Sequence, residues 1–321
     1  MSTTVLQQML AGVQVDLGGR GLQKVPERNL VTETRGDFEK ACADLANHAA
    51  PHVAIVTGFY IAAATPPAAE TDGPPGSVFL ARAIVELGGR VSLLCDDWCV
   101  AAIHAGLSAH GISTGAISVL ALPGPAESIG WKPNDYWRWL LDRIDMPTHV
   151  VAIEHVGPCY DSDQCFSARG RDLSEFTSPV HLLFEESKLR PPLLRTIGIG
   201  DGGNEIGMGK IPRDIIEANI PLGRTIACRI ATDWLIVAGT SNWGAYALAA
   251  GFRLLKGAPL AAEMFDRDHE YRIMESLVHA GPLVDGMTGT KSVTVDGIGF
   301  ERYIEPLRKI GTICGTAPTL A

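Results

Sequence analysis

Five short runs of apolar, largely β-branched residues recur along the chain, each ended by glycine or by polar residues. They span 53–57, 91–95, 150–153, 196–199 and 234–238. Apolar positions within them are nearly continuous and do not alternate with polar ones, which is typical of strands buried on both faces of a sheet. The pattern therefore predicts five central strands.

Helical periods lie between these runs. Apolar side chains repeat at helical spacing over 38–45, 80–87, 137–144 and 248–255. Strands that alternate with helices predict an α/β fold: a doubly wound, largely parallel sheet with helices on both faces and long loops at the carboxyl ends of the strands. We expect a single α/β domain over 1–321, with an N-terminal helical segment, about 1–50, packed on it.

Composition and charge argue against several classes of protein. The chain is 46% hydrophobic and 20% charged, which is ordinary for a globular protein. Its net charge is -9 and no basic run exceeds a pair of residues, so the electrostatic footprint of a nucleic-acid-binding protein is missing. The seven cysteines form no C-x-x-C pair, and we interpret them as small core residues.

No segment is predicted to enter a membrane. The longest apolar stretch, 53–64, is shorter than the roughly 20 residues that a transmembrane helix needs. The N-terminus has neither the basic region of a secretory signal nor the Arg-rich pattern of a transit peptide. We therefore predict a cytoplasmic protein that does not bind membranes.

Polar residues follow each predicted strand. They are Thr57 and Gly58, Asp96 and Asp97, Glu154 and His155, Asp201 to Glu205, and Thr240 to Asn242. The carboxyl ends of parallel strands lie at one edge of a sheet, and ligands of such sheets bind beyond that edge. We expect these residues to converge on one site.

The segment 198–209 is the densest chemical signal, with six glycines in 12 residues. It formally matches the dinucleotide fingerprint G-x-G-x-x-G, but later glycines and Pro212 interrupt the helix that the fingerprint requires. Asp201, Glu205 and Asn204 suit an ammonium group or an oxygen-ligated cation such as Mg²⁺ or Ca²⁺ better than a diphosphate. The alternative is a tight loop whose acids only cap backbone N–H groups.

Two further loops carry candidate residues. In 70–76 a Pro-Pro pair stiffens the chain before a predicted helix, and the N–H groups of 76–78 are expected to form an anion site at its start. Asp72 in this loop is either a general base or metal ligand, or an Asp-Gly turn residue. Arg169, in the irregular loop 157–171, is the residue type that binds a carboxylate with two hydrogen bonds, although a lone loop arginine is usually solvated.

Seven blocks of sequence carry a resemblance to a known family. They are VDLGGRGL (15–22), VTGFYI (56–61), ETDGPPG (70–76), LARAIVELGG (80–89), GIGDGGNEIGMGK (198–210), AGTSNWGAYAL (238–248) and VDGMTG (284–289). In this order they resemble the D-glutamate cyclase family, over about 15–300. Two places depart from the family's pattern: His155-Val156 stands where an Arg-Pro pair is expected, and Ser167-Ala168 where Asn-Met is expected.

The resemblance implies a hydro-lyase, a carbon–oxygen lyase that interconverts D-glutamate and 5-oxo-D-proline plus water by intramolecular lactam formation. It implies that Asp201 and Glu205 hold the ammonium group or a divalent cation, that one of them is the general base, and that Asp72 or Glu154 donates a proton. The remaining assignments are Arg169 to the α-carboxylate, Gly202, Gly203 and Asn204 to the developing oxyanion, and Ser241, Asn242, Thr57 and Gly58 to further substrate contacts. The reaction requires no cofactor unless Mg²⁺ or Ca²⁺ occupies Asp201 and Glu205.

Other functions stay open at this point. One is a nucleotide-dependent enzyme, another a metal-assisted amidohydrolase acting on a related small acidic metabolite, and a third a non-catalytic binding protein for such a metabolite. In each case the expected partner is a small molecule. The sequence leaves the oligomeric state undecided, a homo-oligomer included.

Overall fold

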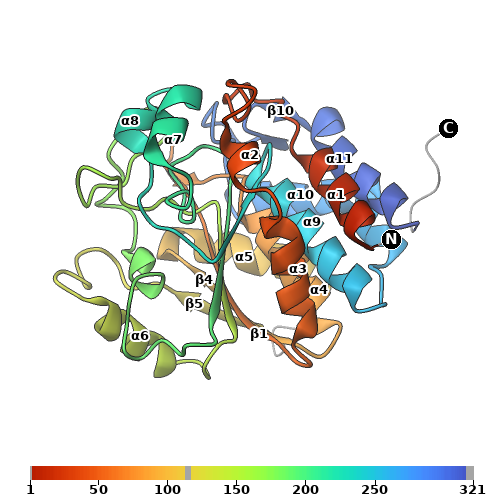
Figure 1. Ribbon diagram of the computed structural model, residues 1–321, viewed down its shortest axis with the longest axis horizontal. Coiled ribbons are helices and arrows are strands. Elements are labelled where there is room, and N and C mark those ends of the chain that lie inside the picture. The colour runs from red at the N-terminus through yellow and green to blue at the C-terminus, as the bar shows by residue number, and fades with distance from the viewer. Residues whose placement is uncertain (1, 113–116, 316–321) are drawn as a thin grey trace.

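The computed structural model describes residues 2–112 and 117–315 (Figure 1). Its strands are β1 (His52–Thr57), β2 (Tyr60–Ile61), β3 (Ala68–Ala69), β4 (Arg90–Cys95), β5 (Ile117–Ala121), β6 (His149–Ile153), β7 (Arg195–Gly200), β8 (Trp234–Val237), β9 (Thr294–Val295) and β10 (Ile298–Gly299). Its α-helices are α1 (Ser2–Val13), α2 (Leu30–Glu33), α3 (Asp37–Asn47), α4 (Pro74–Val85), α5 (Asp97–Ala109), α6 (Pro133–Leu141), α7 (Arg213–Asn219), α8 (Gly223–Ile226), α9 (Ser241–Leu255), α10 (Arg267–His279) and α11 (Phe300–Ile313). Two 3₁₀ helices, η1 (Val180–Leu183) and η2 (Ala262–Phe265), complete the elements.

A six-stranded parallel sheet forms the centre of the protein. Its strand order is β5-β4-β1-β6-β7-β8. The chain therefore winds outward from β1 to β5 and then returns to the other side of β1 for β6, β7 and β8. Doubly wound sheets bind ligands where the winding reverses, beyond the carboxyl ends of the strands. Here that switch point lies between the ends of β1 and β6.

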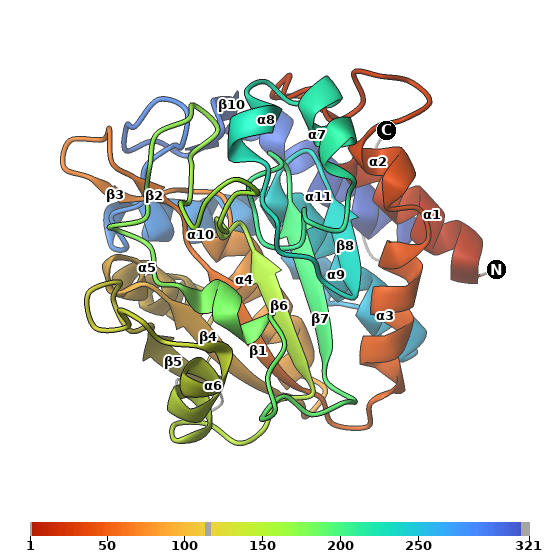
Figure 2. The same cartoon turned by 60° about the vertical axis from the view of Figure 1, so that its left-hand side comes forward.

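The sheet separates two apolar cores, because successive side chains of a strand point to opposite faces. On one face Ile55 and Ile153 pack with α1, α3, α4, α5, α9, α10 and α11. On the other face Val56 and Ala152 pack with α2, α6, η1, α7 and α8. Figure 2 shows these two layers of helices on either side of the strands. The predicted doubly wound α/β architecture is confirmed.

The five predicted strands correspond to β1, β4, β6, β7 and β8, with ends that differ by no more than one residue. The edge strand β5 was not predicted, although residues 119–122 are apolar; its side chains are mostly exposed or half-buried, unlike those of the central strands. Regular structure surrounds the loop expected over 70–76: β3 pairs with β2 before it, and α4 begins within it at Pro74. The N-terminal segment is helical, as expected.

Helix α9 carries its N-terminus to the carboxyl edge of the sheet. Its first 13 residues are all buried, because it lies against β7 on one side and against α3, α4 and α1 on the others. A Cβ atom at Gly244 would lie 2.5 Å from Ile199 Cγ2, so only glycine permits this close approach. The small residues of α9 thereby fix where its N-terminal Ser241 and Asn242 lie.

No helix in the described part of the chain combines the length and the apolar character needed to cross a bilayer.

Candidate active site

Six buried carboxyl groups gather at the carboxyl edge of the sheet, beside the switch point. This acid cluster consists of Glu70, Asp72, Glu154, Asp201, Glu205 and Asp296, none of which is more than 7% exposed. Glu154 directly follows β6 and Asp201 directly follows β7. Carboxyl oxygens of Asp201 lie within 4.8 Å of those of Asp72 and Asp296, and also of those of Glu154 and Glu205. Asp201 is therefore the centre of the cluster.

Arg20 supplies positive charge inside the acid cluster. Its Nε lies 3.2 Å from Asp201 Oδ2, and its Nη2 lies 2.6 Å from Asp296 Oδ1. The carboxylate of Asp16 holds the Arg20 backbone by accepting its N–H at 2.8 Å and that of Gly21 at 2.8 Å. A Cβ atom at Gly21 would lie 2.3 Å from the backbone oxygen of Asn219, which explains the glycine in this segment. The VDLGGRGL block thus places a cation between two buried acids.

One arginine cannot balance six ionised carboxyl groups in a buried site, so the charged forms of these groups are disfavoured. Burial and neighbouring carboxylates raise the pKa of Glu70 and of Glu154 well above the ordinary value. Burial also raises the pKa of Asp201, although the charge of Arg20 opposes this. Burial raises the pKa of Asp72 to about 7, against the effect of its backbone hydrogen bonds. The cluster therefore offers both proton donors and proton acceptors near neutral pH.

Asp72 and Asn242 cap each other's helices. Asp72 accepts the N–H groups of Ser241 and Asn242 at 2.8 Å each, at the start of α9. Asn242 Oδ1 accepts the N–H groups of Gly73 at 3.0 Å and of Gly76 at 2.8 Å, at the start of α4. The anion site predicted at the start of this helix is therefore wrong, because Asn242 accepts the N–H of Gly76 and the backbone oxygen of Gly73 accepts that of Ser77.

The backbone of Glu154 is strained. Its φ of 47° lies in the left-handed region, where a non-glycine residue costs about 1–3 kcal/mol. Ser241 Oγ donates a hydrogen bond to Glu154 Oε2 at 2.6 Å. On the other side, a Cβ atom at Gly73 would lie 3.0 Å from Glu154 Cβ, so glycine is needed there as well. The surroundings therefore hold this carboxyl group in one position at the end of β6.

Backbone N–H groups of the glycine loop after β7 donate hydrogen bonds to Glu205, an acid of the same loop. Glu205 Oε1 accepts the N–H groups of Asp201 at 3.0 Å and of Gly202 at 2.5 Å, while Glu205 Oε2 is buried without a hydrogen-bond partner among the described residues. The next helix, α7, begins only at Arg213. The formal dinucleotide match therefore lacks the helix N-terminus that would bind a pyrophosphate.

A pocket of about 150 Å³ opens on the acid cluster. Its charged lining consists of Glu70, Glu154, Asp296 and Arg20 from the acid cluster and its surroundings, and of Arg169 and Arg171 from the loop 157–171. Arg169 Nη2 donates to the backbone oxygen of Met287 at 2.8 Å. Aromatic and aliphatic side chains, among them Phe59 and Leu173, form the remaining wall. Such a pocket suits a small molecule that carries both an ammonium and a carboxylate group.

Three residues predicted from the sequence line this pocket: Glu154, Arg169 and Asn204. Asn204 is held by a hydrogen bond from its Nδ2 to the backbone oxygen of Phe166 at 2.8 Å. The other predicted residues are buried and do not line it; they are Thr57, Gly58, Asp72, Asp201, Gly202, Gly203, Glu205, Ser241 and Asn242. Most of the predicted site thus supports the pocket wall from behind.

Four charged residues of the site were not predicted: Arg20, Glu70, Arg171 and Asp296. The first two lie in the VDLGGRGL and ETDGPPG blocks, where the surrounding glycines were the available signal. Asp296 and Gly297 have φ angles of 54° and 75° between β9 and β10, as in a type I′ hairpin turn. The Asp-Gly pair between Val295 and Ile298 indicates such a turn, but not its position beside β7.

The two departures from the family's pattern lie in different surroundings. His155 is fully buried, with its Nε2 3.4 Å from Asp96 Oδ2, and does not line the pocket. Ser167 and Ala168 do line it. A difference in substrate preference is therefore expected from Ser167 and Ala168.

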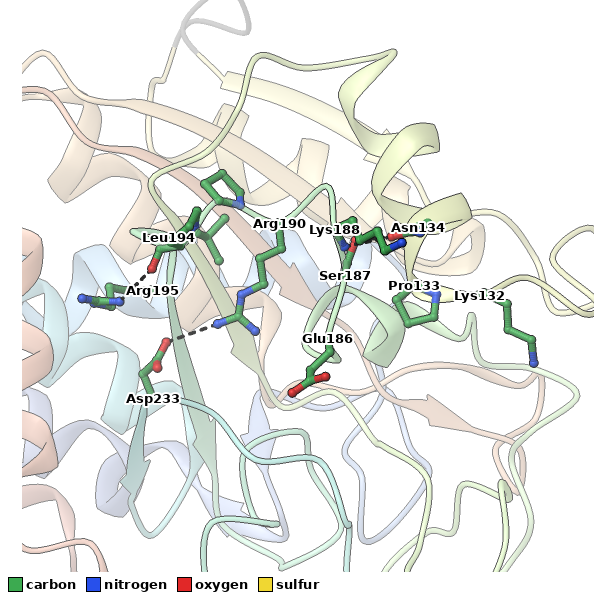
Figure 3. A pocket seen from close by; sticks show the side chains of 12 residues that line it. Lys132, Pro133, Asn134, Glu186, Ser187, Lys188, Arg190, Leu194, Arg195 and Asp233 are labelled. Carbon is green, nitrogen blue, oxygen red and sulfur yellow. Dashed lines mark hydrogen bonds and ion pairs between the residues drawn. The ribbon is translucent and has the colours of Figure 1, made fainter.

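A larger cleft, of about 660 Å³, lies at the opposite edge of the sheet (Figure 3). Lys132, Lys188, Arg190 and Arg195 line it together with Glu186 and Asp233. Arg190 points toward Asp233, with Nη2 3.5 Å from Oδ2, and both lysines are exposed. Its charges are solvated or paired, unlike those of the acid cluster.

A doubly wound parallel sheet with a small, acid-lined pocket at its switch point is the architecture of α/β proteins that bind a small polar molecule at the carboxyl edge. The sequence model described as "D-glutamate cyclase-like, C-terminal" matches residues 10–311, and the chain belongs to this family. It is also 31% identical over 260 residues to the human (Homo sapiens) protein "D-glutamate cyclase, mitochondrial". The match covers 78% of this chain and 39% of the human protein, so the chain spans well under half the length of that relative.

Proposed function

We propose that this protein is a hydro-lyase that interconverts D-glutamate and 5-oxo-D-proline plus water. The observation that carries the proposal is the buried acid cluster at the switch point, beside a pocket that Arg169 and Arg171 also line. Membership of the D-glutamate cyclase-like family and the name of the human relative support the same reaction.

The proton balance of this reaction explains why an acid cluster is useful. In the direction of cyclisation, the ammonium nitrogen loses two protons and becomes the lactam N–H. The γ-carboxylate loses one oxygen as water, which takes up two protons. No net proton is exchanged with solvent, so the site only has to move two protons from nitrogen to oxygen. Carboxyl groups whose pKa values differ are suited to both halves of this transfer.

We assign proton donation to Glu154. It lines the pocket, its pKa is raised mainly by burial, and the hydrogen bond from Ser241 fixes its position. We assign proton acceptance from the ammonium group to Asp296, which lines the pocket and has a buried Oδ2 without a hydrogen-bond partner among the described residues. The assignment of the base to Asp201 or Glu205 stays a prediction, since neither lines the pocket.

Two arginines, Arg169 and Arg20, interact with the two carboxylates of the substrate. Arg169 binds the α-carboxylate, which does not react, as a guanidinium group does with two parallel hydrogen bonds. Arg20, held by Asp201 and Asp296, stabilises the negative charge that develops on the reacting γ-carboxyl oxygen. Closure of the five-membered ring is intramolecular, so the protein only has to hold the bent substrate and exclude water.

The acid cluster also fits a hard divalent cation. Glu154, Asp201 and Glu205 place carboxyl oxygens within 4.8 Å of one another, and Oδ1 of Asp201 and Oε2 of Glu205 lack hydrogen-bond partners among the described residues. Oxygen donors of this kind suit Mg²⁺ or Ca²⁺. A cation bound there would polarise the γ-carboxyl group. The other three-acid group, Asp72, Asp201 and Asp296, fits a cation less well because Arg20 pairs with two of its three members and with only one of the first group.

The proposal is tested by incubating the purified protein with D-glutamate and, separately, with L-glutamate. Each incubation is repeated with EDTA and with added Mg²⁺ or Ca²⁺, and 5-oxoproline is followed by chiral chromatography. Product from the D form alone supports the proposal, and the EDTA arm decides the cation. No product in any arm, and no hydrolysis of 5-oxo-D-proline, would overturn it.

The alternative of a non-catalytic binding protein is tested in the same samples. D-Glutamate that raises the unfolding temperature without any turnover would favour binding alone. The location in the cytoplasm and the single-domain organisation remain predictions that belong with this proposal.

A further inference from the structure

A second cluster of potential ligands lies at the amino edge of the sheet. His149 is the first residue of β6, at the opposite end of that strand from Glu154. Asp44 lies in the last turns of α3, and His48 directly follows this helix. Their spacing of four residues places Asp44 and His48 on the same side of the helix end. The three side chains therefore come from two elements that are far apart in the sequence.

These side chains converge on one point. Asp44 Oδ1 lies 3.1 Å from His149 Nε2 and 4.0 Å from His48 Nε2. The three potential ligand atoms all lie within 4.8 Å of one another. The two imidazole rings meet edge to face, with centroids 4.9 Å apart. A distance of 4.0 Å is too long for a hydrogen bond, so hydrogen bonding alone does not explain the place of His48.

The geometry is close to that of a zinc site. With metal–ligand bonds near 2.1 Å, tetrahedral ligand atoms lie about 3.4 Å apart. The two distances at Asp44 lie on either side of this value. The side chains of Asp44 and His48 are 30% and 37% exposed, so they are free to rotate by the small amount required. Their exposure also leaves room for water as a further ligand.

The surroundings of His149 favour this role. Its Nδ1 lies 2.8 Å from Thr148 Oγ1, which fixes the ring and leaves Nε2 directed at Asp44. Such a partner on the second ring nitrogen is common for histidines that bind metals.

Two cations lie nearby but do not occupy the ligand atoms. Arg195 Nε lies 4.0 Å from Asp44 Oδ2, the oxygen that does not face the histidines. Lys256 Nζ binds the backbone oxygen of His48 at 2.5 Å. Both positive charges weaken the electrostatic attraction of the site for a metal cation. The affinity for the cation therefore has to come from the metal–ligand bonds more than from net charge.

We propose that Asp44, His48 and His149 bind one zinc ion at the amino edge of the sheet, separate from the acid cluster. Two imidazole nitrogens and one carboxylate oxygen select zinc over Mg²⁺ or Ca²⁺, which prefer oxygen ligands only. The bound ion ties the end of α3 to the start of β6. It therefore stabilises the folded state in proportion to zinc concentration.

The test is a titration of chelator-treated protein with Zn²⁺ and, for its visible spectrum, Co²⁺. We expect one zinc per chain, two imidazole nitrogens by X-ray absorption, and a higher unfolding temperature with zinc. His48→Ala should weaken zinc binding at least about tenfold. The matched control is His104→Ala, since His104 is an exposed histidine of α5 outside the cluster. A second variant, Asp44→Asn, should weaken binding without removing a buried side chain.

Three outcomes would overturn the proposal. One is an absence of zinc binding to the wild-type protein at micromolar concentrations. Another is an affinity that His48→Ala leaves unchanged or that His104→Ala lowers equally. The third is a loss of zinc binding in Glu205→Gln while His48→Ala retains it, because the acid cluster would then hold the ion. None of these results bears on turnover of D-glutamate.

Discussion

Charged side chains lie in opposite environments at the two ends of the parallel sheet: they are buried at the carboxyl end and exposed at the amino end. At the carboxyl end the six groups of the acid cluster are withdrawn from water. At the amino end Arg90 pairs with Asp145 at 2.5 Å, but the two side chains are 60% and 75% exposed. Water screens such a pair and leaves it energetically minor, whereas a buried charge depends on its partner.

This difference, and not the size of the cavity, indicates where chemistry takes place. The cleft at the amino end is larger, at about 660 Å³ against about 150 Å³ for the pocket on the acid cluster. Lys132 and Lys188 in the larger cleft remain in contact with water. Burial at the carboxyl end shifts the pKa of Glu154 toward the range in which proton transfer is useful. Five substitutions test this difference between the two ends of the sheet.

The largest effect is expected for Arg20→Met. It leaves Asp201 and Asp296 without their partner, so the free energy of unfolding should fall by about 3–5 kcal/mol at pH 8. The loss should be smaller at pH 5, where carboxyl groups of the cluster take up protons instead. Urea unfolding at both pH values measures this. A loss below about 1 kcal/mol at pH 8 would show that the cluster is already neutral without Arg20.

Glu154→Gln should lower kcat for D-glutamate at least about 100-fold, because glutamine cannot exchange the proton. Glu275→Gln, at an exposed position of α10, is the matched control and should leave kcat unchanged. Glu205→Gln decides whether proton transfer is assigned to Glu154 or to Glu205. If it loses as much activity while Glu154→Gln turns over normally, proton transfer belongs to Glu205.

Arg169→Ala should raise KM for D-glutamate by roughly tenfold to 100-fold, since a hydrogen bond to a charged group contributes about 1.5–3 kcal/mol. Arg169→Lys should recover only part of this, because lysine cannot form two parallel hydrogen bonds. Initial rates over a range of D-glutamate concentrations give both constants. An unchanged KM in Arg169→Ala would remove Arg169 from substrate binding.

Glu70→Gln should change the pH dependence of stability. A carboxyl group whose pKa is raised in the folded protein stabilises it fully below the unfolded pKa of about 4.3. That contribution is lost as the pH rises through the folded pKa, and burial raises the pKa of Glu70. Glutamine resembles the protonated form, so the variant should lose less stability than the wild type between pH 5 and pH 8, by about 1 kcal/mol. Parallel curves for the two proteins would contradict the raised pKa.

The smallest effect is expected at the amino end. Arg90→Met breaks the exposed pair with Asp145 and should change the free energy of unfolding by less than about 0.5 kcal/mol. Turnover should not change. Urea unfolding at low and high salt checks this, and a loss comparable to that of Arg20→Met would erase the contrast between the two ends.

Much of the fold could be read from local patterns. Continuous apolar runs predicted β1, β4, β6, β7 and β8, because a strand buried on both faces has no position for a polar side chain. The edge strand β5 was not predicted, although its sequence is largely apolar, and its partly exposed side chains became apparent only in the folded structure. The cytoplasmic location, the oligomeric state and the single-domain organisation remain predictions.

The candidate site was predicted less completely. Glu154 and Asp201 were found because each directly follows a strand, and position after a parallel strand is a local property. Asp72 and Asn242 were expected to contact substrate, yet they cap helices α9 and α4. A sequence shows that such a side chain can accept hydrogen bonds, but not which donors come within reach.

From the sequence alone we could predict the five central strands, the helical segments that correspond to α3, α4, α6 and α9, the edge of the sheet where acids gather, and the resemblance to the family to which the chain belongs. Only the tertiary structure decided that Arg20 and Asp296, 276 positions apart in the chain, form an ion pair beside Asp201. It also decided which acids are withdrawn from water and which line the pocket. The physical reason is that secondary structure follows from neighbouring residues, whereas burial and charge pairing depend on contacts between segments distant in sequence.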